Sequence, residues 1–203
     1  MTRLTLLAAS LMIAPCSAFA WSGCDETASR DLNLDAAGLE TLVFAARAGE
    51  LRIEGDPGQT RIVVRGTACA SDADLLAQIQ LVPARSGARQ TIEVQMPELK
   101  GWGNQQASLD LVVQVPARLA LDVTDTSGDA EIRGVASLIA KDSSGDFDVR
   151  DIAGDVSLRD SSGDLDVRTV GGSVLVVNDS SGDISIREVQ GDARIEKDSS
   201  GGI

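Results

Sequence analysis

The sequence of 203 residues predicts an all-β protein, a parallel β-solenoid with two short strands in each coil of 17–19 residues, preceded by irregular β coils. First, a phrase close to Asp-Ser-Ser-Gly-Asp recurs at intervals of 17, 18, 19 and 19 residues, and such a period indicates a repeat architecture. Second, apolar and polar residues alternate after each copy, which is typical of half-buried strands. Third, aromatic residues make up only 2% of the chain against 43% hydrophobic residues, so the predicted core is thin and aliphatic.

The first twenty residues, MTRLTLLAASLMIAPCSAFA, have the pattern of a secretory signal peptide. Arg3 supplies the positive end, residues 4–14 the apolar stretch, and residues 18–20 the small-x-small cleavage site. Cys16 also permits a lipoprotein signal, against which Pro15 counts because such signals favour a small residue there. No later segment approaches the ~20 apolar residues of a membrane helix. We therefore expect an exported protein, periplasmic, cell-surface or secreted, with no transmembrane segment in the mature chain.

Removal of the signal leaves two cysteines, Cys24 and Cys69. In an oxidising compartment an isolated pair predicts a disulfide, here between the start of the mature chain and the loop after a strand at residues 61–65. The chain-entropy model gives such a bridge about 3–4 kcal/mol of stabilisation. A reactive thiol is the alternative, but the chain has no histidine that could activate it.

Residues 21–120 predict irregular β structure whose strand order the sequence leaves open. Ser71-Asp72-Ala73-Asp74 ahead of Leu75 predicts the capped start of one short helix. Turn-forming residues such as Asp56-Pro57-Gly58 separate the strands. Alternation with period 2 marks candidate strands around Leu32, Leu42, Leu51, Ile62, Ile92, Leu109 and Leu119.

Residues 121–203 predict the regular coils. Counted from the first Asp of each unit, apolar residues recur at offsets 5, 7, 10, 14 and 16, and glycines at offsets 3 and 12. Each unit is thus a pair of short strands, and a lone pair cannot bury its apolar side. Units stacked in register at about 4.8 Å solve this problem, because like residues then form continuous columns. The first Asp of each unit is expected to cap turn amides two and three residues further on. These residues are Asp125, Asp142, Asp160, Asp179 and Asp198.

The sequence stops at Ser199-Ser200-Gly201-Gly202-Ile203, just after one of these turns. Solenoids generally have capped ends. We therefore expect that this chain is truncated at its C-terminus, with an exposed coil edge that pairs with another chain or another copy as the alternative.

The repeats have the form SGD, apolar-x-apolar, Arg, x-V-x-G-D-V-x-apolar, as in SGDLDVRTVGGSVLV. With the signal peptide and the early cysteine pair, they resemble the bacterial exported β-strand-repeat proteins of unknown function that are classed as putative adhesins. The resemblance is best over residues 121–203 and looser over residues 31–120. It implies the architecture, and it brings no established catalytic residues to this chain.

One outward strand face is expected to carry acidic columns beside an arginine column, because offsets 4, 6 and 8 point the same way. The candidate contact residues on it are Asp146, Asp148, Arg150, Asp164, Asp166, Arg168, Asp183 and Arg187. Trp102, between two glycines of a polar loop, is a further single contact candidate. A solvated ion-pair network that sets register is the alternative interpretation of the same face, because surface ion pairs are individually weak.

The formal net charge of −13 counts against nucleic acid and anionic membrane surfaces as partners. Surplus carboxylates in stacked turns could bind Ca²⁺, which takes six to eight oxygen ligands, and the candidates are Asp142, Asp160 and Asp179. However, the G-G-x-G-x-D spacing of Ca²⁺-binding β-rolls is absent. We therefore expect no cofactor, with Ca²⁺ as the alternative.

The composition predicts that the protein is not an enzyme. Equivalent, repeated acids do not form the unequal carboxyl pair that sugar hydrolysis needs, and no histidine can serve as a general base. A rigid rod with a regular polar face instead predicts an adhesin-like binding module for a surface, a polysaccharide or a protein. A structural scaffold that pairs through its exposed coil edge, and a Ca²⁺-binding repeat protein, remain the alternatives.

Overall fold

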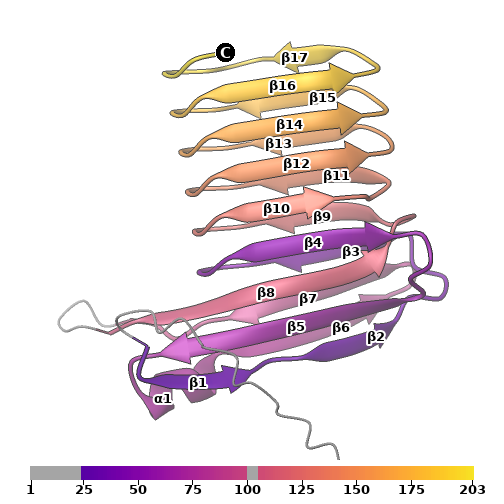
Figure 1. Ribbon diagram of the computed structural model, residues 1–203. Coiled ribbons are helices and arrows are strands. Elements are labelled where there is room, and N and C mark those ends of the chain that lie inside the picture. Colours follow the sequence, from indigo (N-terminus) through magenta and orange to yellow (C-terminus); the bar gives the residue numbers. More distant parts are fainter. Residues whose placement is uncertain (1–23, 100–104) are drawn as a thin grey trace, which may run out of the picture.

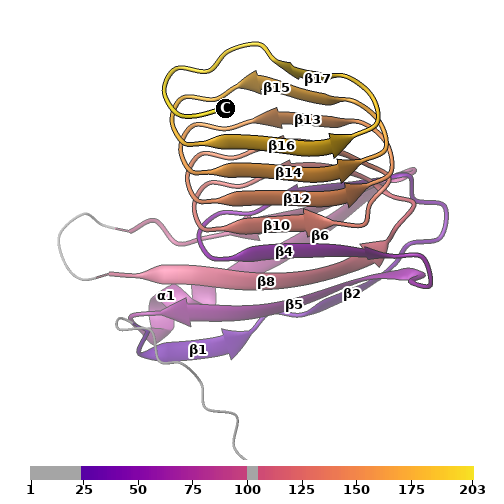
Figure 2. The same ribbon diagram turned by 45° about the horizontal axis from the view of Figure 1, so that its top comes forward.

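The computed structural model describes residues 24–99 and 105–203, and it is all-β, with two sheets that face one another (Figure 1). Within these residues, sheet A has nine strands and sheet B has eight. Most strand pairs are parallel, and they lie in successive coils of one stack (Figure 2). The predicted β-solenoid is therefore confirmed. The predicted signal peptide and Trp102 lie outside the described residues.

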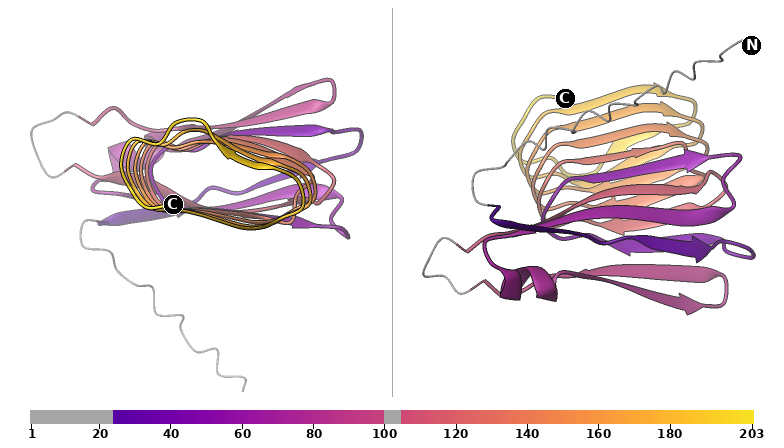
Figure 3. Two further views of the ribbon diagram at one scale, coloured as in Figure 1. Left: turned by 90° about the horizontal axis from the view of Figure 1, so that it is seen from above. Right: turned by 60° about the horizontal axis from the view of Figure 1, so that its bottom comes forward.

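The repeat coils stack in parallel and in register, each with one strand in sheet B and the next in sheet A. Phe147 pairs with Leu165, and Leu165 pairs with Ile184, so equivalent offsets of consecutive units do share a column. Seen from above, the coils lie over one another in one flattened outline (Figure 3). In chain order the strands are β9 (Ala120–Thr124), β10 (Ala130–Arg133), β11 (Ser137–Lys141), β12 (Phe147–Ile152), β13 (Val156–Arg159), β14 (Leu165–Val170), β15 (Val174–Asn178), β16 (Ile184–Val189) and β17 (Ala193–Ile195).

Before the repeats, the order of coils in the stack differs from their order in the chain. Strands β3 (Thr41–Ala45) and β4 (Leu51–Asp56) form a coil that lies under β9 and β10. On its other side this early coil pairs with β7 (Arg89–Gln95) and β8 (Ala107–Pro116), which follow it in the chain. The strand order that the sequence left open is thus one in which a coil is inserted between two later ones.

Antiparallel strands close the end of the stack beyond β7 and β8 (Figure 3). Strand β5 (Arg61–Ala70) pairs with β8, and β1 (Glu26–Ser29) and β2 (Leu32–Asp35) pair with β5. In sheet B the closing strand is β6 (Gln80–Ser86), which pairs with β7. Strands β1 and β6 are not predicted by the sequence, because their side chains are mostly exposed and alternate weakly.

The predicted short helix is confirmed as α1 (Ala73–Gln78), between β5 and β6. Asp72 is its N-cap, and its Oδ1 accepts a hydrogen bond from the amide of Leu75 at 2.8 Å. This bond satisfies one of the amide groups that the first turn of a helix leaves unpaired.

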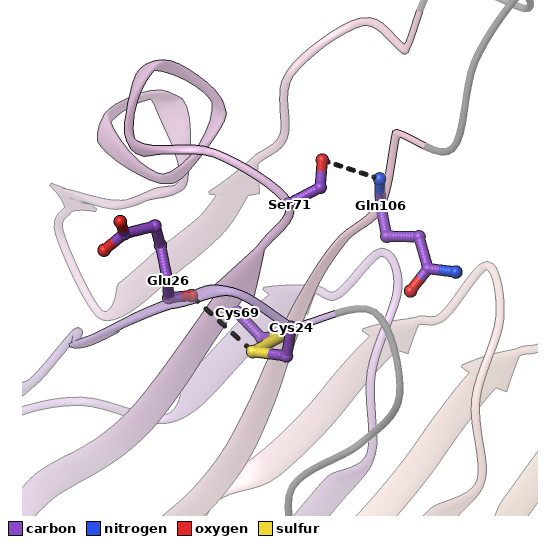
Figure 4. Close-up of a disulfide and its surroundings, with 5 residues drawn as sticks. All are labelled: Cys24, Glu26, Cys69, Ser71 and Gln106. Carbon is purple, nitrogen blue, oxygen red and sulfur yellow. Dashed lines mark hydrogen bonds between the residues drawn. A yellow bond between two sulfur atoms is a disulfide. The ribbon is translucent and has the colours of Figure 1, made fainter.

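The predicted disulfide between Cys24 and Cys69 is confirmed, with the two Cα atoms 5.5 Å apart (Figure 4). Cys69 lies within strand β5 and not in a loop after residue 65 as expected. The strand continues through Gly66, whose carbonyl accepts a hydrogen bond from the amide of Arg30 at 2.8 Å. The bridge therefore joins the start of the described chain to the antiparallel closing layer.

The core is a set of aliphatic columns between the two sheets. Ile53, Ile132, Val149 and Val167 follow one another in register from β4 to β14, and each is 0% exposed. Full burial of such a side chain stabilises the fold by about 1.5–3 kcal/mol. The columns continue across residue 120, so both parts of the chain contribute to one hydrophobic core. The division into two parts at that residue stays a prediction.

The glycine at offset 3 of each unit is required by the close approach of consecutive coils. Gly145, Gly163 and Gly182 have φ angles of 122°, 128° and 132°. A Cβ atom on Gly163 would lie 1.9 Å from the carbonyl oxygen of Gly145, the equivalent residue one coil earlier. The glycine of the repeated Ser-Gly-Asp phrase is therefore a steric requirement of stacking.

We predict that Gly163→Ala lowers the free energy of unfolding by about 3 kcal/mol or more, since both the backbone conformation and the carbonyl contact oppose a side chain. Gly87→Ala is the matched control, because Gly87 also has a positive φ but an added Cβ would have no atom within 4 Å. We expect the control to lose only about 1 kcal/mol. Equal losses in urea unfolding of the two variants would contradict the steric explanation.

Candidate binding face and polar corner

A continuous ladder of ion pairs crosses the outer face of sheet A. The arginines at offset 8 reach an acid of the preceding coil: Arg168 lies 2.8 Å from Asp148, and Arg187 lies 2.9 Å from Asp166. Arg168 also lies 3.4 Å from Asp166 of its own strand, so consecutive pairs are joined. We define the ion-pair ladder as Arg52, Glu131, Arg150, Asp148, Arg168, Asp166 and Arg187.

The acids at offset 4 form a separate column along one edge of the same face. In each repeat coil, Oδ1 of this acid accepts a hydrogen bond from the main-chain amide of the equivalent residue in the next coil. Asp146 accepts from Asp164 at 3.0 Å, and Asp164 from Asp183 at 2.9 Å. We define the acid column as Asp110, Glu50, Asp129, Asp146, Asp164 and Asp183, in stacking order. All six are exposed, and none forms an ion pair with any residue that the structure describes.

The sequence grouped offsets 4, 6 and 8 as one face, and the structure divides their charges. The acids at offset 6 are neutralised by the arginines at offset 8, whereas the acids at offset 4 are not. The difference arises because an arginine of one coil reaches back along sheet A to the acid of the preceding coil, as Arg168 does to Asp148. The surplus negative charge of this face therefore lies in the acid column.

A groove of about 590 Å³ lies where the acid column meets the closing layer. Glu50, Asp110, Asp129 and Asp146 line it together with Arg65 of β5. Glu50, Asp110 and Arg65 were missed by the sequence interpretation because they lie outside the repeats and reach this face only through the pairing of β4, β5 and β8. The sequence did contain one feature that could have placed Asp110 on this face: it directly precedes an apolar strand residue, as Asp146 does.

The first Asp of each unit is buried and not exposed in a turn. Asp125, Asp142 and Asp160 are 2% exposed and Asp179 is 1% exposed, and we call these four residues the buried Asp column. Six of their eight carboxylate oxygens have no hydrogen-bond partner among the described residues: Asp125 Oδ2, Asp160 Oδ2 and both oxygens of Asp142 and Asp179. A buried polar group without a partner is costly, so this column requires an explanation.

The expected capping by these acids is only partly observed. Oδ1 of Asp125 accepts a hydrogen bond from the amide of Thr126 at 2.7 Å, and Oδ1 of Asp160 accepts from Ser161 at 2.6 Å. These donors are one residue further on and not two or three, because the carboxyl groups turn inward. Only Asp198, which is half-exposed, accepts from the residue two further on, the amide of Ser200 at 3.2 Å.

Serine hydroxyl groups complete the corner. The hydroxyl of Ser162 donates to the carbonyl of Ser143 one coil earlier at 3.1 Å, and that of Ser200 donates to Ser180 at 3.0 Å. These bonds satisfy carbonyl groups that no strand pairing reaches at the turn. The phrase Asp-Ser-Ser-Gly-Asp is therefore a set of five stacked columns, in which the first Asp is buried and the final Asp is exposed to solvent.

Burial raises the pKa of every member of the buried Asp column, and the neighbouring acids of the column or of adjacent turns raise it further. The pKa of Asp125 is raised to about 7 and that of Asp160 to about 6. Nearby main-chain amides offset part of the rise, those of Thr126 at Asp125 and of Ser161 at Asp160.

Within residues 24–99 and 105–203, no three His, Cys, Asp or Glu side chains are grouped so that they could hold a metal ion. The Ca²⁺ candidates Asp142, Asp160 and Asp179 follow one another along the stack and do not converge on one point. No helix in this part of the chain is long and apolar enough to cross a membrane.

Residues 78–203 match the family model of Toastrack DUF4097. The chain belongs to the Toastrack DUF4097 family. The resemblance to β-strand-repeat proteins is thereby confirmed, and with it the β-solenoid-like fold. A search of curated proteins finds no match.

Solved structures with a similar arrangement include proteins from three bacteria. A putative cell adhesion protein from Clostridium sporogenes is 12% identical, with 85% of this chain and 100% of that chain covered and a TM-score of 0.44. A putative lipid binding protein from Parabacteroides distasonis is 16% identical, with coverages of 89% and 96% and a TM-score of 0.40. A putative adhesin from Bacteroides fragilis is 14% identical, with coverages of 86% and 97% and a TM-score of 0.35.

We predict that Arg168→Met lowers the free energy of unfolding by about 1 kcal/mol at low ionic strength, because it leaves Asp148 and Asp166 with fewer cationic partners. The loss should shrink at about 1 M salt, where the Debye length is only about 3 Å. Arg159→Met on sheet B is the control, since Arg159 is exposed and forms no ion pair with a described residue. A loss that is the same at both ionic strengths, or equal in the control, would contradict a role of the ladder in stability.

Proposed function

We propose that this chain is an exported, non-catalytic binding module that holds an extended, positively charged polymer along the acid column. The observation that carries the proposal is the separation of charge on sheet A: the ion-pair ladder is neutralised internally, whereas the six acids beside it are exposed and form no ion pair with a described residue. The disulfide between Cys24 and Cys69 supports export, because such bridges persist in oxidising compartments.

The geometry of the column favours an elongated ligand. Its carboxylates repeat at the strand spacing of about 4.8 Å, and like charges at about 5 Å repel by roughly 0.8 kcal/mol even in water. A cationic polymer laid along the stack relieves this repulsion at every coil. A basic polysaccharide or a Lys- and Arg-rich segment of a surface protein has the required charge and length.

The groove lies at one end of the acid column, and we take it as the end of the proposed binding site. There the acids Glu50, Asp110, Asp129 and Asp146 line the groove together with Arg52 and Arg65. Arg65, one of the residues that line the groove, supplies a donor for hydroxyl or carboxylate groups. A ligand that combines amino and hydroxyl groups, as an amino-sugar polymer does, fits both parts of the face.

The test is a titration of the protein with chitosan oligomers, polylysine and neutral dextran, measured by calorimetry. We expect binding of the two cationic polymers and no binding of dextran. In the triple variant Asp129→Asn, Asp146→Asn and Asp164→Asn, affinity should fall at least about tenfold, which corresponds to a loss of about 1.4 kcal/mol. Asparagine keeps the Oδ1 acceptor, so the main-chain hydrogen bonds of the column are retained.

The matched control removes the same charge elsewhere, with Asp74→Asn, Asp151→Asn and Asp192→Asn. These acids are exposed and lie outside the acid column. Affinity of the control triple within about twofold of the natural chain would support a site on the column. Equal weakening in both triples would indicate only the attraction of a polycation to an acidic protein, and would overturn the proposal.

A further inference from the structure

We propose that the buried Asp column binds protons that are shared between successive coils, and that losing these protons as the pH rises through the neutral range loosens the solenoid. The column stands where each coil turns from sheet B into sheet A. The amide of Asp142 donates to the carbonyl of Arg159, the residue before Asp160, and that of Asp160 donates to Asn178, the residue before Asp179. Consecutive carboxyl groups are thus held one coil apart within the interior.

Ionised carboxylates accept hydrogen bonds and cannot donate them. Two stacked carboxylates therefore cannot bond one another, and their oxygens remain without partners, as those of Asp142 and Asp179 do within the described part of the chain. A proton on one member turns it into a donor to the next. The proton thus supplies the missing hydrogen bond and removes one buried charge at the same time, as in other carboxyl pairs that share a site.

Among the residues that the structure describes, no cation forms an ion pair with the column. Asp142 is faced by Asp125, Asp160 and Asp129, all of them acids. Asp160 is faced by Asp142 and Asp179, and Asp179 also by Asp198. The basic residues nearest in sequence are Lys141, Arg159 and Lys197, which are exposed on the other side of the backbone and form no ion pair with the column.

The two ends of the column differ in a way that sets where protons are held most strongly. Below Asp125, the equivalent position in the coil of β3 and β4 is Ala46, which is buried and apolar. Above Asp179, the next residue is the half-exposed Asp198. Asp125 therefore lacks both solvent and a polar neighbour on one side, and its pKa of about 7 is higher than the value of about 6 for Asp160.

The sign of the pH dependence follows from the raised values. The reference pKa of these acids is 3.8, so the folded chain binds more protons than the unfolded chain between about pH 4 and pH 7. The stabilisation by the column is complete below the unfolded pKa. It is lost progressively as the pH rises through the folded values. Paired surface carboxylates give the opposite trend.

The test compares thermal unfolding of the natural chain with that of Asp160→Asn from pH 5 to pH 8. Asparagine cannot ionise and carries its own donor, so it replaces a protonated Asp permanently. We expect the melting temperature of the natural chain to fall by about 5 °C across this range, and that of Asp160→Asn to fall by clearly less and to exceed the natural value at pH 8.

Asp192→Asn is the control for net charge, since it removes one exposed negative charge outside the column. We expect its curve to run parallel to that of the natural chain. Parallel curves for Asp160→Asn and the natural chain would overturn the proposal. So would a curve for Asp192→Asn that matches that of Asp160→Asn, because general charge repulsion would then explain the trend.

A second measurement does not depend on stability. The infrared carbonyl band of protonated carboxyl groups should be present in the folded natural chain at pH 6 and weakened in Asp160→Asn, and its absence at pH 6 would overturn the proposal. Melting in CaCl₂ and in chelator distinguishes protons from a cation. Unchanged melting temperatures support protons, whereas a rise with Ca²⁺ that is lost in Asp160→Asn would assign the column to a metal ion.

Discussion

The structure depends on one constraint: parallel coils stack in register, so every residue lies directly over its counterpart in the next coil. A residue type is therefore tolerated only if it can pack against a copy of itself. Aliphatic residues meet this condition easily, and Ile53, Ile132, Val149 and Val167 form a dry column. Gly163 meets it only because it has no side chain, since a Cβ would overlap the carbonyl of Gly145.

Acidic residues meet the same condition in three different ways, according to where their column runs. Asp148 and Asp166 at offset 6 are bridged by Arg168. Asp146 at offset 4 uses one oxygen for the main chain of the next coil and leaves the other in solvent. Asp160 at offset 0 is buried and forms no ion pair with any described residue. Protonation is the remaining way for stacked carboxyl groups to coexist there.

The periodic part of the fold could be predicted because stacked coils require similar residues at equivalent positions. The sequence therefore repeats with the length of a coil, as the recurrence of Asp142, Asp160 and Asp179 shows. The direction of each acid could not be predicted. Asp142 and Asp146 are four residues apart in the same turn, and only the inward course of the chain buries the first. The insertion of β3 and β4 between later coils was equally hidden, because alternation identifies a strand but not its neighbour. The groove depends on that insertion, so its residues Glu50 and Asp110 were missed.

The inserted coil also determines how the stack is assembled. Strands β3 and β4 need β7 and β8 on one side and β9 and β10 on the other, all of them later in the chain. Closing these long loops costs more chain entropy than adding a repeat, which joins residues about one coil apart. The disulfide between Cys24 and Cys69 ties the strands of the closing layer and lowers part of that cost. The cross-link therefore restrains the closing layer, while the repeats rely on columns that each new coil extends.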